Sequence, residues 1–253
     1  MVMLYFSGTG NSKYIAELFC WQMSAACHSI EEDVSFGELI GIHEIIGFCY
    51  PVYASRVPGI LREFTVKHAD SLKGKKLIIF CTQVSFSGDG ARAFTDLLPR
   101  KSVDVIYAEH FLMPNNVCNF FPTPLADEEK IQNYLTAAER KMELVCGDVK
   151  AGIVKKRGFN VFSRILGLPQ AAFVPALEWI ARRSVRVNCD CAQCGLCVSI
   201  CPVKNLICED GKITHKHNCI ACYRCVNKCP EKAITALYHS RVKEQYKGVE
   251  PPP

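Results

Sequence analysis

Two copies of one cysteine pattern near the C-terminus constrain this 253-residue chain more than any other feature. The stretches CAQCGLCVSICP (191–202) and CIACYRCVNKCP (219–230) both follow the pattern C-x2-C-x2-C-x3-C-P. Three closely spaced thiolates wrap one side of a cube-shaped iron–sulfur cluster, and in two-cluster proteins the cysteine before proline ligates the other cluster. The spacing therefore predicts two [4Fe-4S] clusters held by two interlocked sets of cysteines.

The first predicted set is Cys191, Cys194, Cys197 and Cys229, and the second is Cys219, Cys222, Cys225 and Cys201. A pair of structural zinc sites is the alternative, because zinc also takes four cysteines. Zinc ribbons and fingers place two cysteine pairs well apart, so the triple spacing favours clusters. Cys189 and Cys208 fall outside both sets. The other six cysteines lie in apolar surroundings, as buried thiols in a reducing compartment do.

At the other end of the chain, the apolar run VMLYF is followed by SGTGNS and then by a stretch of helical periodicity. This order predicts a strand, a glycine-containing loop and a helix whose N-terminus presents N–H groups and hydroxyls to an anion. Further strands are predicted at 44–52, 75–82 and 103–111, between helices around 58–68, 89–99 and 126–146. The alternation predicts an α/β fold with a doubly wound parallel sheet, which binds ligands at the carboxyl ends of its strands.

Residues 1–148 resemble a short-chain flavodoxin: SGTGNS is similar to the FMN-phosphate loop, and PVYASRVP and TQVSFSGDG are similar to the two ring-side loops. The resemblance implies that the phosphate of FMN is held by Ser7, Gly8, Thr9, Gly10, Asn11 and Ser12. It also implies that the isoalloxazine ring is flanked by Pro51, Val52, Tyr53, Thr82, Gln83, Phe86 and Gly88. The first ring-side loop has Ala54 and Ser55 where many flavodoxins have glycine. A flavodoxin-like fold that has lost FMN is the alternative.

Charge is distributed unevenly along the chain. Residues 1–149 hold 13 Lys and Arg against 18 Asp and Glu, whereas residues 150–188 hold eight against one. The basic segment is predicted to be a helical connector, broken at Gly167–Pro169, that docks the two domains together through an apolar stripe of Phe159, Phe162, Ile165 and Trp179. A helix lying on a membrane surface is the alternative. The segment lacks the interleaved aromatic platform of single-strand binders and any DNA-binding motif, so nucleic acid is not expected as a partner.

No apolar run approaches the roughly 18–20 residues that span a bilayer, and the N-terminus lacks the basic start of a secretory signal. We therefore expect a cytoplasmic protein without an integral membrane segment, with peripheral membrane contact left open. The expected domains are residues 1–149, a connector of residues 150–184, and residues 185–253.

The arrangement as a whole resembles the fused flavodoxin–ferredoxin electron-transfer proteins of anaerobes. The resemblance implies a flavodoxin-like sheet domain followed by a small α+β two-cluster ferredoxin domain. It implies that low-potential electrons pass between two [4Fe-4S] clusters, FMN and an unidentified redox partner protein. A flavin-dependent reductase of a small substrate, fed by the clusters, and a redox sensor are the alternatives. We identify no catalytic residues, since no paired carboxylates, Ser-His or Cys-His arrangement lies near the ring-side loops.

Overall fold

The computed structural model describes residues 1–86, 88–120, 122–250 and 252. Within them, the larger sheet has six strands in the order β2-β1-β3-β4-β5-β6, and every neighbouring pair is parallel. These strands are β1 (Val2–Tyr5), β2 (Ala26–Ser29), β3 (Ile45–Pro51), β4 (Lys76–Gln83), β5 (Asp104–Leu112) and β6 (Lys155–Lys156). The first five strands have the 2-1-3-4-5 order of a flavodoxin-like doubly wound sheet, which confirms the predicted fold class.

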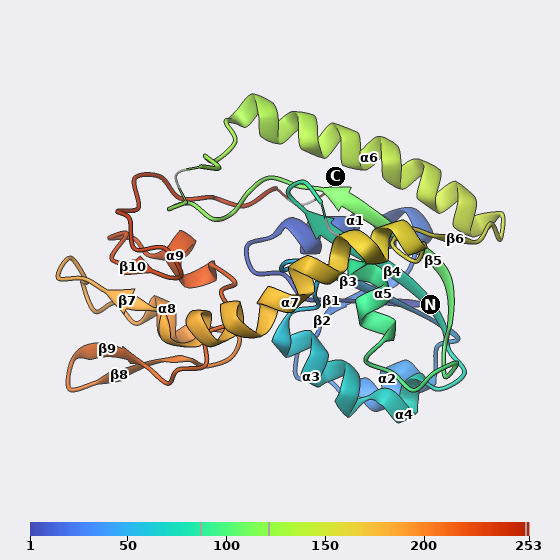
Figure 1. Ribbon diagram of the computed structural model, residues 1–253, viewed down its shortest axis with the longest axis horizontal. Coiled ribbons are helices and arrows are strands. Elements are labelled where there is room, and N and C mark those ends of the chain that lie inside the picture. The colour runs from blue at the N-terminus through green and yellow to red at the C-terminus, as the bar shows by residue number, and fades with distance from the viewer. Residues whose placement is uncertain (87, 121, 251, 253) are drawn as a thin grey trace.

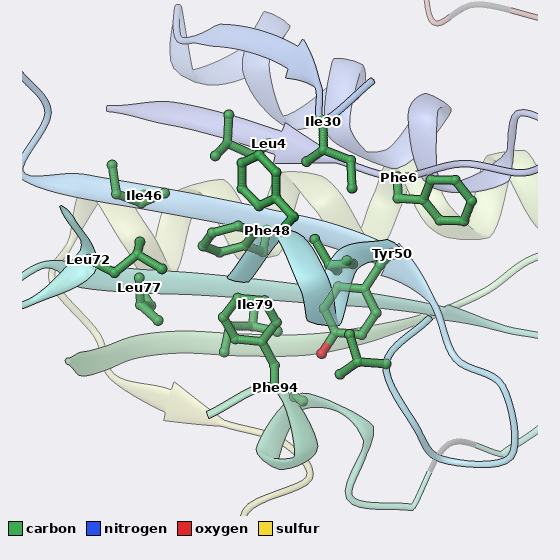
Figure 2. Packing of buried hydrophobic residues seen from close by; sticks show 14 of the residues in the cluster. Leu4, Phe6, Ile30, Ile46, Phe48, Tyr50, Leu72, Leu77, Ile79 and Phe94 are labelled. Atoms are coloured by element: carbon green, nitrogen blue, oxygen red, sulfur yellow. The ribbon is translucent and has the colours of Figure 1, made fainter. Parts of the chain in front are cut away.

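Helices cover both faces of this sheet, which explains why its central strands are apolar on both sides. One face lies against α1 (Asn11–Met23) and α6 (Glu128–Lys150). The opposite face lies against α2 (Phe36–Gly41), α3 (Gly59–Lys67), α4 (Ala69–Leu72) and α5 (Gly90–Thr95). Figure 2 shows this second face, where the rings of Phe48 and Tyr50 from β3 pack against Phe94 from α5.

The C-terminal domain, residues 186–250, is small and carries both cysteine blocks. Strand β7 (Arg186–Val187) pairs with β10 (Ile234–Thr235), and β8 (Leu206–Glu209) pairs with β9 (Lys212–His215), both antiparallel. Two short helices, α8 (Leu196–Ser199) and α9 (Arg224–Lys228), each contain the third cysteine of a block. Figure 1 shows this domain beside the sheet domain, with one long helix crossing between them.

The segment between the two domains differs from the prediction in two ways. It contributes β6, whose two lysines pair with β5 and so extend the sheet. It then forms a single helix, α7 (Val161–Arg183), without the predicted break at Gly167–Pro169. Gly167 is buried, and a Cβ at this position would overlap the carboxylate of Asp89. Tertiary packing here overrides the low helix propensity of glycine and proline.

The predicted docking stripe is wrong for three of its four residues. Phe159 is half-buried and packs against the sheet core. The side chains of Phe162, Ile165 and Trp179 are instead 70%, 59% and 61% exposed. The buried residues of α7 are smaller and lie seven apart: Gly167, Val174 and Ala181. The connector therefore packs through the face opposite the one that its apolar pattern indicated.

Three basic residues at the start of the connector contact the sheet domain. Lys155, Lys156 and Arg157 form ion pairs with acidic residues of the sheet domain: Asp148, Asp104 and Glu109, respectively. Arg182, Arg183 and Arg186 form no ion pair within the described residues. In the part of the chain that the structure describes, no helix is both long enough and apolar enough to span a bilayer.

Candidate cofactor sites

The loop between β1 and α1 presents hydrogen-bond donors at a helix N-terminus. Gly10 has φ +110°, a left-handed conformation that favours glycine. Within the described residues no side chain caps the first turn of α1, so its N–H groups are left for a bound group. Ser7 Oγ accepts from the Gly10 N–H at 3.1 Å, and Ser12 Oγ lies 2.7 Å from Thr82 Oγ1. These features fit an anion such as a phosphate.

A cavity of about 380 Å³ opens beside this loop, at the carboxyl ends of β1, β3 and β4. Its volume falls within the range of small-ligand sites. Ten of the thirteen residues predicted to hold FMN line it: Ser7, Gly8, Thr9, Asn11, Ser12, Pro51, Val52, Tyr53, Thr82 and Gln83.

Three residues predicted to hold FMN do not line the cavity. Gly10 shapes the anion loop at the start of α1. Phe86 is 47% exposed, and Gly88 packs against Gly167 of α7. Ser87, which belongs to the same ring-side loop, lies outside the described residues. The second ring-side loop therefore contributes its first residues to the cavity, while Gly88 serves the contact with the connector.

Several segments that the motifs did not indicate also line this cavity. The loop after β5 contributes Asn116, which donates to Thr9 Oγ1 at 2.9 Å. The connector contributes Val174, Leu177 and Ala181 from α7. In the sequence, the seven-residue spacing of Gly167, Val174 and Ala181 could have indicated which side of α7 faces the cavity. The larger apolar residues between them obscured this spacing.

The residues around the cavity fit FMN. The uncapped first turn of α1 supplies N–H donors for a terminal phosphate. Gln83 Oε1 is buried and has no hydrogen-bond partner among the described residues, so it is available to accept from a ring N–H. The aliphatic side chains of Val52, Ile60 and Leu177 supply apolar surface for a flat ring. Together these groups match a ligand with an anionic terminal phosphate and an apolar ring that also forms hydrogen bonds.

Two smaller cavities in the C-terminal domain are each lined by four cysteines. One is lined by Cys201, Cys219, Cys222 and Cys225, and the other by Cys191, Cys194, Cys197 and Cys229. In each cavity the cysteine before proline comes from the other block, in agreement with the interlocked sets. The assignment of these cysteines as ligands stays a prediction. Among the described residues, no three His, Cys, Asp or Glu side chains are arranged to hold a single metal ion.

The two blocks repeat the same backbone conformation. The residue before the second cysteine is left-handed in both, with φ +56° at Gln193 and +53° at Ala221. The residue after it is also left-handed, with φ +75° at Gly195 and +61° at Tyr223. A tyrosine in this conformation is strained, and it persists because its ring is buried and its hydroxyl donates to the Ala236 carbonyl at 2.6 Å.

Backbone N–H groups and burial set the chemistry of the sulfur atoms. N–H groups of Asn205 and Ala221 donate to the sulfurs of Cys201 and Cys219, respectively, at 3.2 and 3.3 Å. Such hydrogen bonds tune the reduction potential of a cluster. Burial raises the pKa of the Cys222 thiol to about 12, against the opposing effect of Arg224. A thiolate at Cys222 therefore needs a bound cation, which iron would supply.

Arg224 joins the second block to the anion loop. Its guanidinium donates to the carbonyls of Ser7 and Gly8 at 2.8 and 3.1 Å and pairs with Glu31 at 2.6 Å. The backbone at Cys222 comes so close that a Cβ on Gly8 would overlap the Cys222 carbonyl. Glycine is thus required at position 8 for the approach of the C-terminal domain.

The same contact brings the second block to the large cavity. Cys219, Ile220 and Ala221 line that cavity together with Tyr53 from the first ring-side loop. Burial raises the pKa of Tyr53, and the neighbouring Cys222 and Cys219 thiols add to the rise. The cavity lined by Cys201, Cys219, Cys222 and Cys225 is therefore the one next to the candidate flavin site.

Comparison with protein families assigns both parts of the chain. The model of the flavodoxin domain family matches residues 2–122. Two models of 4Fe-4S binding domains match residues 190–204 and 213–235, one for each cysteine block. The chain combines an N-terminal flavodoxin domain with C-terminal 4Fe-4S binding domains. Both are electron-transport domains, and the flavodoxin domain contains the anion loop and the residues from Pro51 to Gln83 that line the large cavity.

Solved structures similar to this chain include flavodoxins. The two-electron reduced Megasphaera elsdenii flavodoxin is 24% identical, with a TM-score of 0.38, and the match covers 44% of this chain and 85% of that one. Flavodoxin 2 from Bacillus cereus is 16% identical, with a TM-score of 0.36 and coverage of 54% and 93%. A flavodoxin from the domain Archaea is 15% identical, with a TM-score of 0.37 and coverage of 57% and 96%. No curated protein matches the chain.

Proposed function

We propose that this chain carries electrons between FMN in the flavodoxin domain and two [4Fe-4S] clusters in the C-terminal domain, in exchange with a redox partner protein. FMN exchanges electrons singly or in pairs, and each cluster exchanges one at a time. The chain itself supplies the positions, the electrostatics and the shielding from water. One observation carries the proposal: Cys219 of the second cysteine block lines the same cavity as Thr82 and Gln83 of the flavodoxin domain.

The geometry supports an order among the three cofactors. The set containing Cys219 and Cys222 is proximal to the flavin cavity, since its block contacts Gly8 and lines that cavity beside Tyr53. The other set is distal, and its Cys194 is exposed on the surface of the C-terminal domain. We take the distal cluster as the one that exchanges electrons with the partner protein.

A single-electron injection experiment tests this proposal. Protein prepared without oxygen and holding its cofactors receives one electron from a photochemical donor, and the flavin and cluster absorbance bands are followed separately. We expect electrons to equilibrate between clusters and flavin at a rate that does not depend on protein concentration. A rate that rises in proportion to protein concentration would mean that electrons pass between molecules, and the proposal would fail.

Cysteine variants test the order of the cofactors in the same experiment. Cys222→Ala should abolish exchange with the flavin, because it removes the proximal cluster. Cys194→Ala should retain exchange between the flavin and the remaining proximal cluster. The opposite pattern would reverse the assignment of proximal and distal clusters.

A further inference from the structure

Helix α7 is oriented with its apolar side outward. Nine of its large apolar side chains are exposed, among them Phe162, Ile165, Phe173 and Trp179. At 3.6 residues per turn these four fall on the side opposite Gly167, Val174 and Ala181, which face the protein. An exposed apolar face of this extent on a folded domain marks an interaction surface.

Specific contacts with the flavodoxin domain hold the packed side of α7 in place and so keep its apolar side turned outward. Gly167 lies against Gly88 and Asp89 of the flavodoxin domain. Ser55 Oγ donates to Gln170 Oε1 at 2.8 Å, and Arg62 forms an ion pair with Glu178 at 2.6 Å. The helix cannot turn its apolar face inward without breaking these contacts. Figure 1 shows α7 running across the molecule from the C-terminal domain to the sheet.

The charges that border the apolar face are positive. Arg164 and Arg182 lie on one flank of the helix, eighteen residues or five turns apart, and Arg183 lies at its C-terminal end. Arg183 stacks over the Trp179 ring at 4.7 Å. The single carboxylate of the helix, Glu178, is turned to Arg62 on the packed side. An apolar face with aromatic residues and arginine borders is typical of helices that lie in the surface of an anionic bilayer.

A second copy of the chain is a poorer occupant on charge grounds. In either a parallel or an antiparallel pairing of two α7 helices, arginines meet arginines and no unpaired carboxylate of α7 meets them. Like charges placed opposite each other are destabilising. An anionic lipid surface instead accepts the aromatic side chains into its boundary layer and offers phosphates to the arginines.

We propose that α7 docks the protein on the surface of an anionic lipid bilayer, with its exposed apolar face buried among the headgroups and the helix lying parallel to the membrane. The helix then separates the bilayer from the flavin cavity, which its other side lines through Val174 and Ala181. This binding does not depend on whether the cofactors exchange electrons, so its test is independent of the proposed function.

Sedimentation with vesicles tests the docking. Protein holding its cofactors is mixed with phosphatidylcholine vesicles, with and without an equal share of phosphatidylglycerol. We expect binding to the anionic vesicles, and Phe162→Glu with Phe173→Glu should weaken it at least about tenfold. A matched control replaces two exposed apolar residues elsewhere, Ile42→Glu with Leu144→Glu, and should bind nearly as the unmodified protein does. An equal loss of binding to anionic vesicles in the two double variants would overturn the proposal.

The contribution of the arginines to membrane binding is tested by Arg164→Glu with Arg183→Glu. This double variant should bind anionic vesicles more weakly, by roughly fivefold or more for each residue. Lys67→Glu with Lys101→Glu makes the same charge change at exposed positions outside α7 and should have a much smaller effect. Unchanged flavin and iron content in every variant serves as the check on folding. Equal binding to neutral and anionic vesicles would overturn the charge argument.

Tryptophan fluorescence locates the contact. The chain has two tryptophans, so Trp21→Phe leaves Trp179 as the single reporter. On anionic vesicles the Trp179 emission should shift to the blue and be quenched by lipids brominated near the headgroup. Unshifted emission with vesicles present would overturn the proposal. So would a dimer in solution that Phe162→Glu with Phe173→Glu dissociates, since a second copy would then cover the face.

Discussion

At the scale of single residues, Gly8 decides how closely the two domains approach. A Cβ on Gly8 would overlap the Cys222 carbonyl, which belongs to the backbone and cannot move aside without moving the cluster block. Gly8→Ala should therefore push the C-terminal domain away from the anion loop and slow electron exchange between flavin and clusters at least tenfold. The rate measured after photochemical injection checks this. Gly147→Ala, where the added Cβ meets nothing within 4 Å beyond its own turn of helix, is the matched control and should leave the rate unchanged.

His110 gives the stability a dependence on pH. Burial, with the positive charge of Arg157 adding to it, lowers the pKa of His110 to about 4. In the unfolded chain a histidine has a pKa of about 6.5, so the unfolded state binds the extra proton between these values and stability falls as pH falls. Between about pH 7.5 and 5.5 the loss from this residue is about 1.4 kcal/mol. Urea unfolding at both pH values checks it, and the same pH dependence in His110→Gln would contradict it.

At the scale of elements, the interlocking of the two cysteine blocks is the feature to test. Cys201 follows α8 in the first block, yet it lines the cavity of Cys219, Cys222 and Cys225 in the second. Protein made without oxygen should hold about eight iron and eight sulfide per chain. Cys201→Ala should damage the proximal cluster and spare the distal one, as seen by electron paramagnetic resonance of the reduced protein. Damage confined to the distal cluster, or stoichiometric zinc without sulfide, would contradict the assignment.

Elements with a strong local pattern could be predicted from the sequence. Strands β1, β3, β4 and β5 appeared as apolar runs because both of their faces are covered, and the spacing of each cysteine block is itself the motif. Strand β2 (ACHS) and strand β6 (KK) have no such run, since one is half-exposed and the other is exposed at the sheet edge. Their place in the sheet is decided by pairing with a neighbour rather than by their own residues.

The orientation of α7 could not be predicted for a related reason. Its periodicity showed an amphipathic helix, and the larger apolar side chains were taken as the packing face. Packing is instead decided by how closely backbones approach, which at Gly167 leaves no room for a side chain. Part of the large cavity was missed with it, because Val174 and Ala181 line that cavity from the packed side. A pattern of polarity shows that a helix has two faces without showing which one meets the protein.

At the scale of the whole molecule, the two domains are held together by contacts between residues far apart in sequence. Arg224 and Glu31 are 193 residues apart, and Tyr246 near the C-terminus donates to Asn11 Oδ1 in the first turn of α1. Asn227 Nδ2 donates to the Asn116 carbonyl at 2.8 Å. These bonds tie the C-terminal domain and the C-terminal tail to the anion loop and to the loop after β5. They predict that the flavodoxin domain and the C-terminal domain unfold together.

Arg224 is the residue whose loss should separate the two unfolding events. It is mostly buried, donates to the carbonyls of Ser7, Gly8 and Ile200, and pairs with Glu31, so Arg224→Ala leaves several acceptors and one carboxylate without a partner. Hydrogen bonds to charged groups contribute about 1.5–3 kcal/mol each, so the variant should lose on the order of 3 kcal/mol of interdomain stability. Thermal unfolding followed by cluster absorbance should then precede unfolding followed by flavin fluorescence, whereas the two coincide in the unmodified protein. Lys76→Ala breaks an exposed ion pair with Glu44 within the flavodoxin domain and should have a much smaller effect on stability, with the two transitions still coincident. Coincident transitions in Arg224→Ala would mean that the domains are held together mainly by the packing of α7 and not by this cluster of hydrogen bonds.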